Sequence, residues 1–76
     1  MGPQAELQAT IRDGWLITPY AGHDLAQVHI AVSGAEGWHP AYLDWSDGAR
    51  VAKIRPVGHG RVWLRVDGEV TAVGYV

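Results

Sequence analysis

Apolar and polar residues alternate with a period of two along much of the chain. The clearest example is segment 61–66, RVWLRV, in which valine and leucine alternate with arginine and tryptophan. Successive side chains of a β-strand point to opposite faces of its sheet, so this pattern predicts a strand with one apolar face and one basic, aromatic face. No stretch keeps an apolar helical period for three turns, so we expect no helix.

Turn signals separate these alternating segments. The dipeptide Asp-Gly occurs at 13–14, 47–48 and 67–68. It favours the type I′ turn of a two-residue hairpin, because both central residues of that turn take a positive φ. Gly58-His59-Gly60 predicts a fourth turn. These signals delimit seven expected strands, at 6–12, 15–20, 25–32, 41–46, 50–57, 61–66 and 69–76, with the longest loop at 33–40.

The spacing of the turns predicts the fold class. We expect residues 1–76 to form a single all-β domain, a small antiparallel sandwich or barrel of six to seven short strands joined by Asp-Gly hairpins. The closing sequence VTAVGYV resembles the end of some SH3-like barrels, and the number of strands resembles that of immunoglobulin-like sandwiches. These resemblances imply an SH3-like or Ig-like arrangement and assign no activity.

Hairpin geometry predicts which side chains share a face. A two-residue turn at 47–48 pairs strand 41–46 with strand 50–57, and a three-residue turn at 58–60 pairs the latter with strand 61–66. Both turns give the same assignment of faces. The predicted inner face consists of Ala41, Leu43, Ala52, Ile54, Val62, Leu64 and Val66. The predicted outer face consists of Tyr42, Asp44, Lys53, Arg55, Arg61, Trp63 and Arg65.

Two further expectations depend on this alternation. Trp45 continues the inner set that includes Leu43, so we expect it in the core. For the turn at 67–68 we expect a three-residue loop with a bulge, which pairs Leu64 with Ala72 and keeps the faces consistent.

Composition limits how this domain can be stable. The 76 residues include no cysteine, which excludes disulfides and thiolate zinc sites, and no phenylalanine, so tryptophan must help to fill the core. A domain of this size is marginally stable alone, so we expect a protein partner or self-association. No signal peptide or membrane span is visible, so we expect a cytoplasmic chain with no membrane partner.

The outer face is the candidate binding surface. The net charge is only −2, yet five of the six basic residues lie between positions 50 and 65. We expect a partner to contact Trp63, Arg55, Arg61, Arg65, Lys53, Tyr42 and Trp38. Tryptophan and arginine often dominate binding energy, which favours a protein-protein interaction or assembly module. The alternative without a binding role is a solvated face on which the aliphatic parts of the arginine side chains cover Trp63.

Two other ligand classes stay open for the same surface. Nucleic acid or another polyanion would bind the basic residues and stack on Trp63. A carbohydrate-binding module would use Trp38, Tyr42 and Trp63, because aromatic rings stack on sugar rings. A polyanion binder loses affinity steeply with salt, whereas a sugar binder is nearly insensitive to it.

The sequence predicts neither catalysis nor a cofactor. The histidines lack the short spacing of zinc motifs; they are His23, His29, His39 and His59. No serine or threonine lies in a nucleophile elbow, and Gly58 and Gly60 precede a strand rather than the helix of a phosphate loop. A domain of this size also leaves little room for a ligand pocket. We therefore expect a non-enzyme without metal or cofactor.

Overall fold

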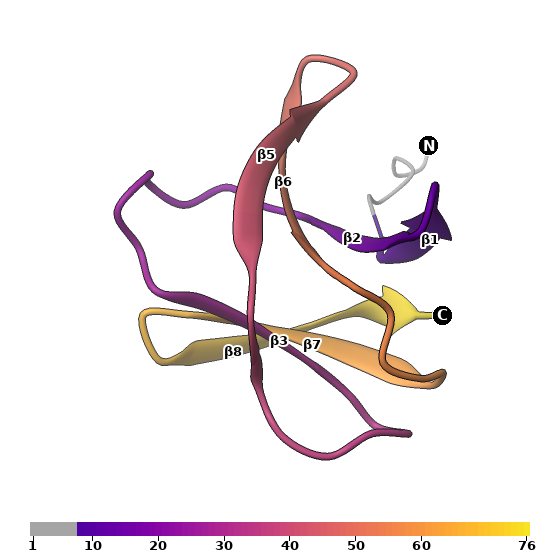
Figure 1. The fold of residues 1–76 in the computed structure, drawn as a ribbon. Coiled ribbons are helices and arrows are strands. Elements are labelled where there is room, and N and C mark those ends of the chain that lie inside the picture. The colour runs from indigo at the N-terminus through magenta and orange to yellow at the C-terminus, as the bar shows by residue number, and fades with distance from the viewer. Residues whose placement is uncertain (1–7) are drawn as a thin grey trace, which may run out of the picture.

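The computed structural model describes residues 8–76, which form eight strands and no helix. In chain order they are β1 (Thr10–Arg12), β2 (Trp15–Pro19), β3 (Val28–Val32), β4 (His39–Pro40), β5 (Tyr42–Ser46), β6 (Ala49–Ile54), β7 (Arg61–Val66) and β8 (Glu69–Tyr75). Sheet A has the order β1-β2-β6-β5 and sheet B the order β4-β3-β7-β8. All pairs are antiparallel, and the β5–β6 hairpin stands across β3, β7 and β8 (Figure 1). The all-β prediction is confirmed.

All three Asp-Gly dipeptides have the positive φ angles that the sequence predicts. The φ angles of the aspartates lie between 48° and 55°, and those of the following glycines between 80° and 92°. Both central residues are therefore left-handed, as a type I′ turn requires. Residues 6–7 of the first expected strand lie outside the described residues.

Several expected boundaries change, and two changes alter the topology around β3. β3 begins at Val28, and residues 23–27 before it form a loop. His39–Pro40, within the expected loop 33–40, pairs with β3 as a short additional strand. The chain then passes through Ala41 into β5, so this segment joins sheet B to sheet A.

One predicted strand pairing is wrong. β6 lies between β2 and β5, so both of its edges are hydrogen-bonded and neither is left for β7. β7 pairs instead with β3 and β8. Pro56 has no N–H to continue the ladder of β6, and residues 55–60 carry the chain from sheet A to sheet B. The segment Gly58–Gly60 is therefore a connection between sheets and not a hairpin turn.

The predicted inner face is confirmed although that pairing is not. Its members are buried or partly buried in one core: Ala41, Leu43, Ala52, Ile54, Val62, Leu64 and Val66. Leu16, Ile30 and Val32 lie at the centre of the same core. Alternation decides the face of each strand whichever strand lies beside it, so the assignment does not depend on the pairing.

Trp45 does not lie in the core. It is 64% exposed, although it lies on the same face of β5 as Leu43. The β5–β6 hairpin extends past the edge of sheet B (Figure 1), so the other sheet does not cover position 45. The Trp45 ring packs on the guanidinium of Arg50, whose Cζ is 5.1 Å from the ring centroid.

The turn between β7 and β8 also differs from the prediction. Leu64 pairs with Thr71 and not with Ala72, so residues 67–68 form a two-residue turn without a bulge. A tight type I′ turn already matches the twist of the two strands, so no extra residue is needed there.

An irregularity instead interrupts β8 near its end. The register shifts between the pairs Trp63–Ala72 and Arg61–Tyr75, next to Gly74, whose φ is 113°. The extra residue turns Tyr75 to the outer face of sheet B, beside Arg61. This local shift contributes one aromatic ring to the surface described next.

Candidate functional site

The structure divides the predicted site between two sheets. Tyr42 and Lys53 lie on strands of sheet A, and Arg55 directly follows β6. The other predicted residues, Arg61, Trp63, Arg65 and Trp38, lie on β7 or against it in sheet B. The expectation of one continuous surface is wrong because it depended on pairing β6 with β7.

An aromatic–arginine row crosses the outer face of sheet B, and it consists of Trp38, Arg65, Trp63, Arg61 and Tyr75. The Arg65 Cζ lies 4.5 Å from the centroid of the Trp38 ring, and the Arg61 Cζ lies 5.1 Å from that of Tyr75. Arg61 Nη2 also donates a hydrogen bond to the Tyr75 hydroxyl. Trp63 lies between the two arginines on the same face of β7.

Trp63 is half-buried at the middle of this row. Its neighbours on the adjacent strands are Ala31 of β3 and Ala72 of β8. These small side chains support the base of the indole without enclosing it. Burial by the flanking arginine stems and contact with a partner are both compatible with this placement.

No carboxylate in residues 8–76 neutralises the arginines of the row. The ion pairs of that range involve Arg12, His23, Arg50 and Lys53 instead. The outward-facing residues of the three longer strands of sheet B include no Asp or Glu: His29, Ala31, Arg61, Trp63, Arg65, Val70, Ala72 and Tyr75. The guanidinium groups therefore keep N–H donors for a ligand.

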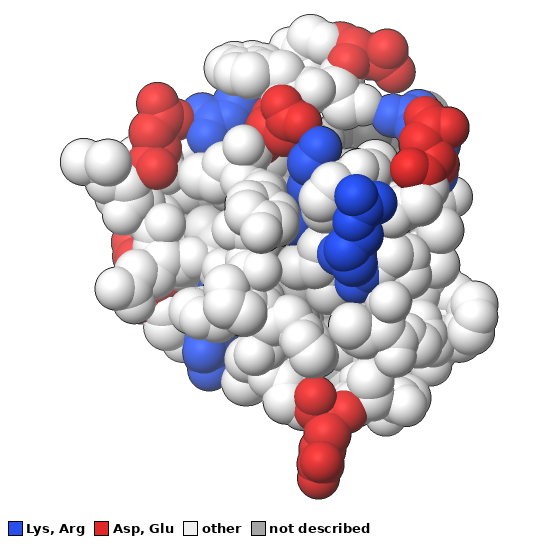
Figure 2. All heavy atoms as spheres, in the orientation of Figure 1, with Lys and Arg blue, Asp and Glu red and all other residues white. Residues whose placement is uncertain are grey.

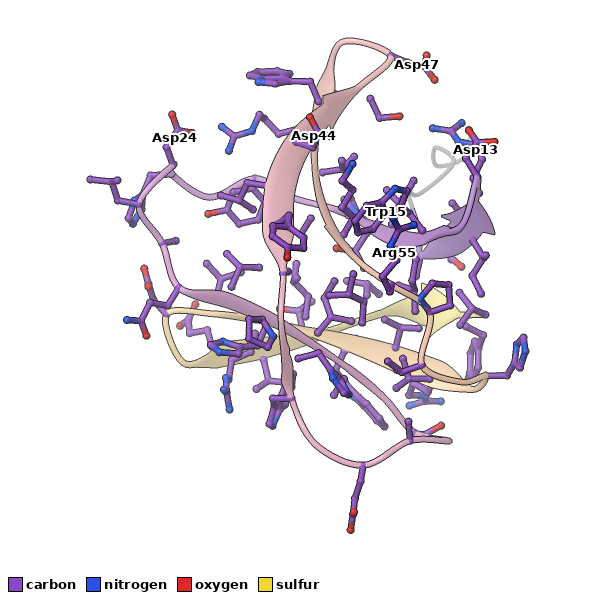
Figure 3. The ribbon with its side chains drawn as sticks, viewed as in Figure 1. Asp13, Trp15, Asp24, Asp44, Asp47 and Arg55 are labelled. Atoms are coloured by element: carbon purple, nitrogen blue, oxygen red, sulfur yellow. The ribbon has the colours of Figure 1, made fainter. Side chains whose placement is uncertain are left out.

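A second aromatic cluster lies on the outer face of sheet A around Trp15. The Lys53 Nζ is 4.3 Å and the Arg55 Cζ 3.8 Å from the centroid of the Trp15 ring. Tyr42 meets this ring edge-on, with centroids 6.0 Å apart. Arg55 also donates to the carbonyl oxygen of Gly14 at 3.0 Å. Figure 3 shows Trp15 and Arg55 together at the front of the molecule.

Two cations on the outer face of sheet A are paired with carboxylates. Lys53 Nζ donates to Asp44 Oδ2 at 2.7 Å, and Arg12 lies between Ser46 and Asp47. The hydrogen bond from Lys53, followed by one from the Trp45 N–H, lowers the pKa of Asp44 below its ordinary value. Acidic and basic side chains are interspersed on the face drawn in Figure 2. These cations are therefore less available to a ligand than those of sheet B.

Sequence reasoning missed the roles of Trp15 and Tyr75. Trp15 follows a recognised turn, but its contact with Lys53 depends on the pairing of β2 with β6, which no turn predicts. Tyr75 reaches Arg61 only because of the register shift near Gly74. The signal that could have identified Tyr75 is Gly74, because a glycine within a strand often marks a bulge that shifts the register.

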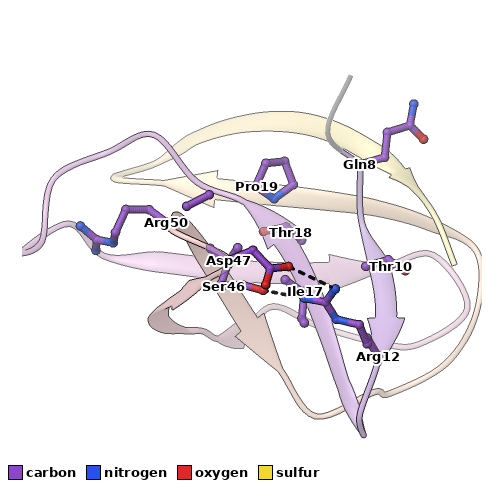
Figure 4. A pocket seen from close by; sticks show the side chains of 11 residues that line it. Gln8, Thr10, Arg12, Ile17, Thr18, Pro19, Ser46, Asp47 and Arg50 are labelled. Atoms are coloured by element: carbon purple, nitrogen blue, oxygen red, sulfur yellow. Dashed lines mark hydrogen bonds and ion pairs between the residues drawn. The ribbon is translucent and has the colours of Figure 1, made fainter. Parts of the chain in front are cut away.

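Two open cavities are larger than the sequence led us to expect. One, of about 350 Å³, lies on sheet A, where Arg12 reaches across to Ser46 and Asp47 (Figure 4). The other is a groove of about 530 Å³ between β8 and the segment after β2, with Tyr20 and Leu64 among its lining residues. In residues 8–76, no three His, Asp or Glu side chains are grouped to hold a metal ion.

No protein-family model matches the chain, and no curated protein or solved structure matches it significantly. The resemblances to SH3-like barrels and immunoglobulin-like sandwiches gain no support from these comparisons. Residues 8–76 include no helix long and apolar enough to cross a membrane. The two outer faces are therefore the features from which function is inferred.

Proposed function

We propose that the chain is a non-catalytic binding module and that the aromatic–arginine row recognises a protein partner. The observation that supports this most is that two guanidinium groups flank Trp63, each on an aromatic ring, with no carboxylate beside them in the described residues. Tryptophan, tyrosine and arginine are the residue types that most often dominate binding energy at protein interfaces.

The chemistry of the row favours an acidic partner. A guanidinium that lies over an aromatic ring has a fixed orientation, and its free N–H groups suit the two oxygens of a carboxylate. Arg61 and Arg65 are four residues apart on one strand, which corresponds to about 14 Å at ~3.4 Å per residue. We expect an extended partner segment in which two carboxylates flank an apolar side chain that contacts Trp63.

The two other ligand classes have weaker support. A polyanion would need more cations than Arg61 and Arg65, because Lys53 and Arg55 lie with sheet A. A sugar site built on Trp38, Tyr42 and Trp63 would need three rings on one surface. Tyr42 contacts Trp15 on sheet A instead.

Selection of short random peptides on the wild-type chain tests the proposal without a known partner. We expect the selected peptides to be enriched in Asp and Glu around an apolar residue. The double charge reversal Arg61→Glu/Arg65→Glu should weaken their binding more than about tenfold, because both carboxylate contacts become repulsive. The matched reversal Arg55→Glu changes an arginine on the other sheet and should leave the affinity within about twofold.

Trp63→Ala separates a binding role from a solvated surface. We expect it to weaken binding of the same peptides by more than about 1 kcal/mol while folding is nearly intact. Unchanged affinity of the Trp63→Ala variant would contradict the proposal. So would a loss of affinity in Arg55→Glu but not in Arg61→Glu/Arg65→Glu. Selective binding of an oligonucleotide with a steep salt dependence would favour the polyanion alternative.

A further inference from the structure

The outer face of sheet A is concave along one diagonal, and Arg12 spans it. Arg12 lies in β1 and Ser46 at the end of β5, with β2 and β6 between those strands. On a flat sheet three strand spacings amount to about 14 Å, at ~4.8 Å per spacing, which is farther than an arginine side chain reaches. Arg12 Nη2 nevertheless donates a hydrogen bond to Ser46 Oγ, and Arg12 Nη1 lies 3.8 Å from Asp47 Oδ2 (Figure 4). These two corners of the sheet therefore curve toward each other on its outer side.

The contact between Arg12 and Ser46 divides this concave face into two hollows. The larger is the cavity of about 350 Å³, and the smaller one measures about 150 Å³. Both are lined by Arg12, Ile17, Ser46 and Val51. The two hollows are therefore parts of one surface, and the volume of the larger is typical of small-molecule sites, roughly 300–1,000 Å³.

The floor of the larger hollow is apolar. Val51 lies on the outer face of β6, opposite Pro19 of β2 and Asp44 of β5, and does not belong to the central core. It is nevertheless only 9% exposed. Ile17 and Pro19 lie half-buried beside it on the same face. An apolar floor with a few polar groups at its rim is the usual composition of a small-molecule site.

Two opposite charges, those of Arg12 and Asp47, lie at the rim of this floor. Their side chains are 52% and 89% exposed, and at 3.8 Å the pair is too long for a hydrogen bond. An exposed ion pair of this kind contributes little to stability, so a ligand can replace it at small cost. Arg50 also lines the hollow, but its guanidinium is paired with Asp24. Arg12 and Asp47 are therefore the charges that a ligand in the larger hollow meets.

We propose that the larger hollow binds a small uncharged carboxamide with an apolar or aromatic body. The body covers Ile17 and Val51. The amide oxygen accepts a hydrogen bond from the Arg12 guanidinium, and the amide N–H donates one to the Asp47 carboxylate. A ligand carboxylate would be repelled by Asp47, and a ligand cation would be repelled by Arg12. This site is independent of the proposed function, because no residue of the aromatic–arginine row lines it.

Three probes of the same shape test the proposal, because they differ only in the charge of one planar group. They are benzamide, which is neutral, benzoate, which is an anion, and benzamidine, which is a cation. Each is titrated into the full chain, and NMR follows the methyl signals of Ile17 and Val51. We expect benzamide to shift both signals with a dissociation constant in the millimolar range, as for other ligands of its size. It should bind at least about fivefold more tightly than benzoate or benzamidine.

Variants that remove one charge of the rim should change which probe binds most tightly. Asp47→Asn leaves the charge of Arg12, so benzoate should then bind best. Asn-Gly also favours a type I′ turn, so this variant keeps the β5–β6 hairpin. Arg12→Gln leaves the charge of Asp47, so benzamidine should then bind best. Glu36→Gln is the matched control, because it removes an exposed carboxylate from the loop before β4 and should leave the order of the three probes unchanged.

Thermal melting checks that every variant folds. Absence of shifts at Ile17 and Val51 with benzamide would overturn the proposal. So would an order of affinities that neither Asp47→Asn nor Arg12→Gln changes, because the rim would then not distinguish the charge of the ligand. Shifts confined to Leu64 and Thr71 would place benzamide in the groove beside β8 and would also overturn it.

Discussion

The outer faces of the two sheets carry similar side chains in different electrostatic settings. On sheet A, Trp15 contacts Lys53 and Arg55, but Lys53 is hydrogen-bonded to Asp44. On sheet B, the arginines beside Trp63 contact aromatic rings and no carboxylate of the described residues. A count of basic and aromatic residues does not distinguish these two surfaces, whereas the partners of each cation do.

Whether a cation already has a carboxylate partner decides how much binding energy a ligand carboxylate gains from it. An exposed ion pair such as Lys53–Asp44 contributes little to stability, and a ligand carboxylate that binds Lys53 only replaces the carboxylate of Asp44. Asp44 and Asp47 also repel an acidic approach to sheet A. A carboxylate at Arg61 or Arg65 replaces no carboxylate of residues 8–76, so the same ligand gains more binding energy on sheet B.

The largest effect is expected at Leu64, on the reverse side of sheet B from Trp63. Leu64 is 7% exposed and belongs to the central core. Leu64→Ala should lower the free energy of unfolding, measured by urea denaturation, by about 2–5 kcal/mol. Thr71→Ala, at its exposed neighbour on β8, should cost no more than about 0.5 kcal/mol. If Leu64→Ala melts within a few degrees of wild type, the faces of β7 are inverted and the comparison of the two surfaces fails.

A smaller effect is expected at the glycine that brings Tyr75 into the row. At Gly74, with φ of 113°, an added Cβ would lie 2.9 Å from Gln8 Oε1 and 3.1 Å from Gln8 Cβ. Gly74→Ala should cost about 2–3 kcal/mol of stability, because steric contact adds to backbone strain. Gly48→Ala, with φ of 80° and no atom within 4 Å, should cost only about 1 kcal/mol. Equal losses in thermal or urea denaturation would show that the end of β8 is not tightly held.

The smallest effect concerns the ion pair of sheet A. Because the pKa of Asp44 is lowered on folding, the stability that this carboxyl contributes is present above its ordinary pKa of 3.8 and is lost as the pH falls through the lower folded value. Lys53→Gln should raise the pKa of Asp44 toward its ordinary value and leave binding at sheet B unchanged. Titration of the Asp44 carboxyl carbon by NMR measures this. An unchanged midpoint would mean that Lys53 does not hold Asp44 in solution.

Local patterns were sufficient to predict the left-handed conformation of the Asp-Gly residues and most of the core. Asp-Gly predicts left-handed residues because few other dipeptides accept a positive φ at both positions, and residues 47–48 and 67–68 have it. Alternation predicts the buried side of β7 because a strand shows opposite residues to opposite faces. Trp45 is the exception, because alternation does not tell where the opposite sheet ends.

Pairings between distant segments could not be predicted in the same way. No local sequence pattern shows that β6 is hydrogen-bonded on both edges, by β2 and by β5. The sequence therefore predicted Arg55 on the same face as Trp63, whereas in the structure it lies over Trp15. Alternation did predict that Arg61, Trp63 and Arg65 share one face of their strand, but no pattern in the sequence predicted that Trp38 lies against Arg65. It did not predict that Tyr75 completes the row, because that depends on a register shift within β8.

The most direct test of the difference between the two faces uses the tryptophans as reporters. The chain has four, and each indole N–H gives one signal in a nitrogen–proton NMR spectrum, assigned by single Trp→Phe variants. The acidic peptide selected on the wild-type chain is titrated into the labelled protein. We predict that the signals of Trp63 and Trp38 shift while those of Trp15 and Trp45 stay in place. A shift at Trp15 with Trp63 unmoved would contradict the assignment of the binding surface to sheet B.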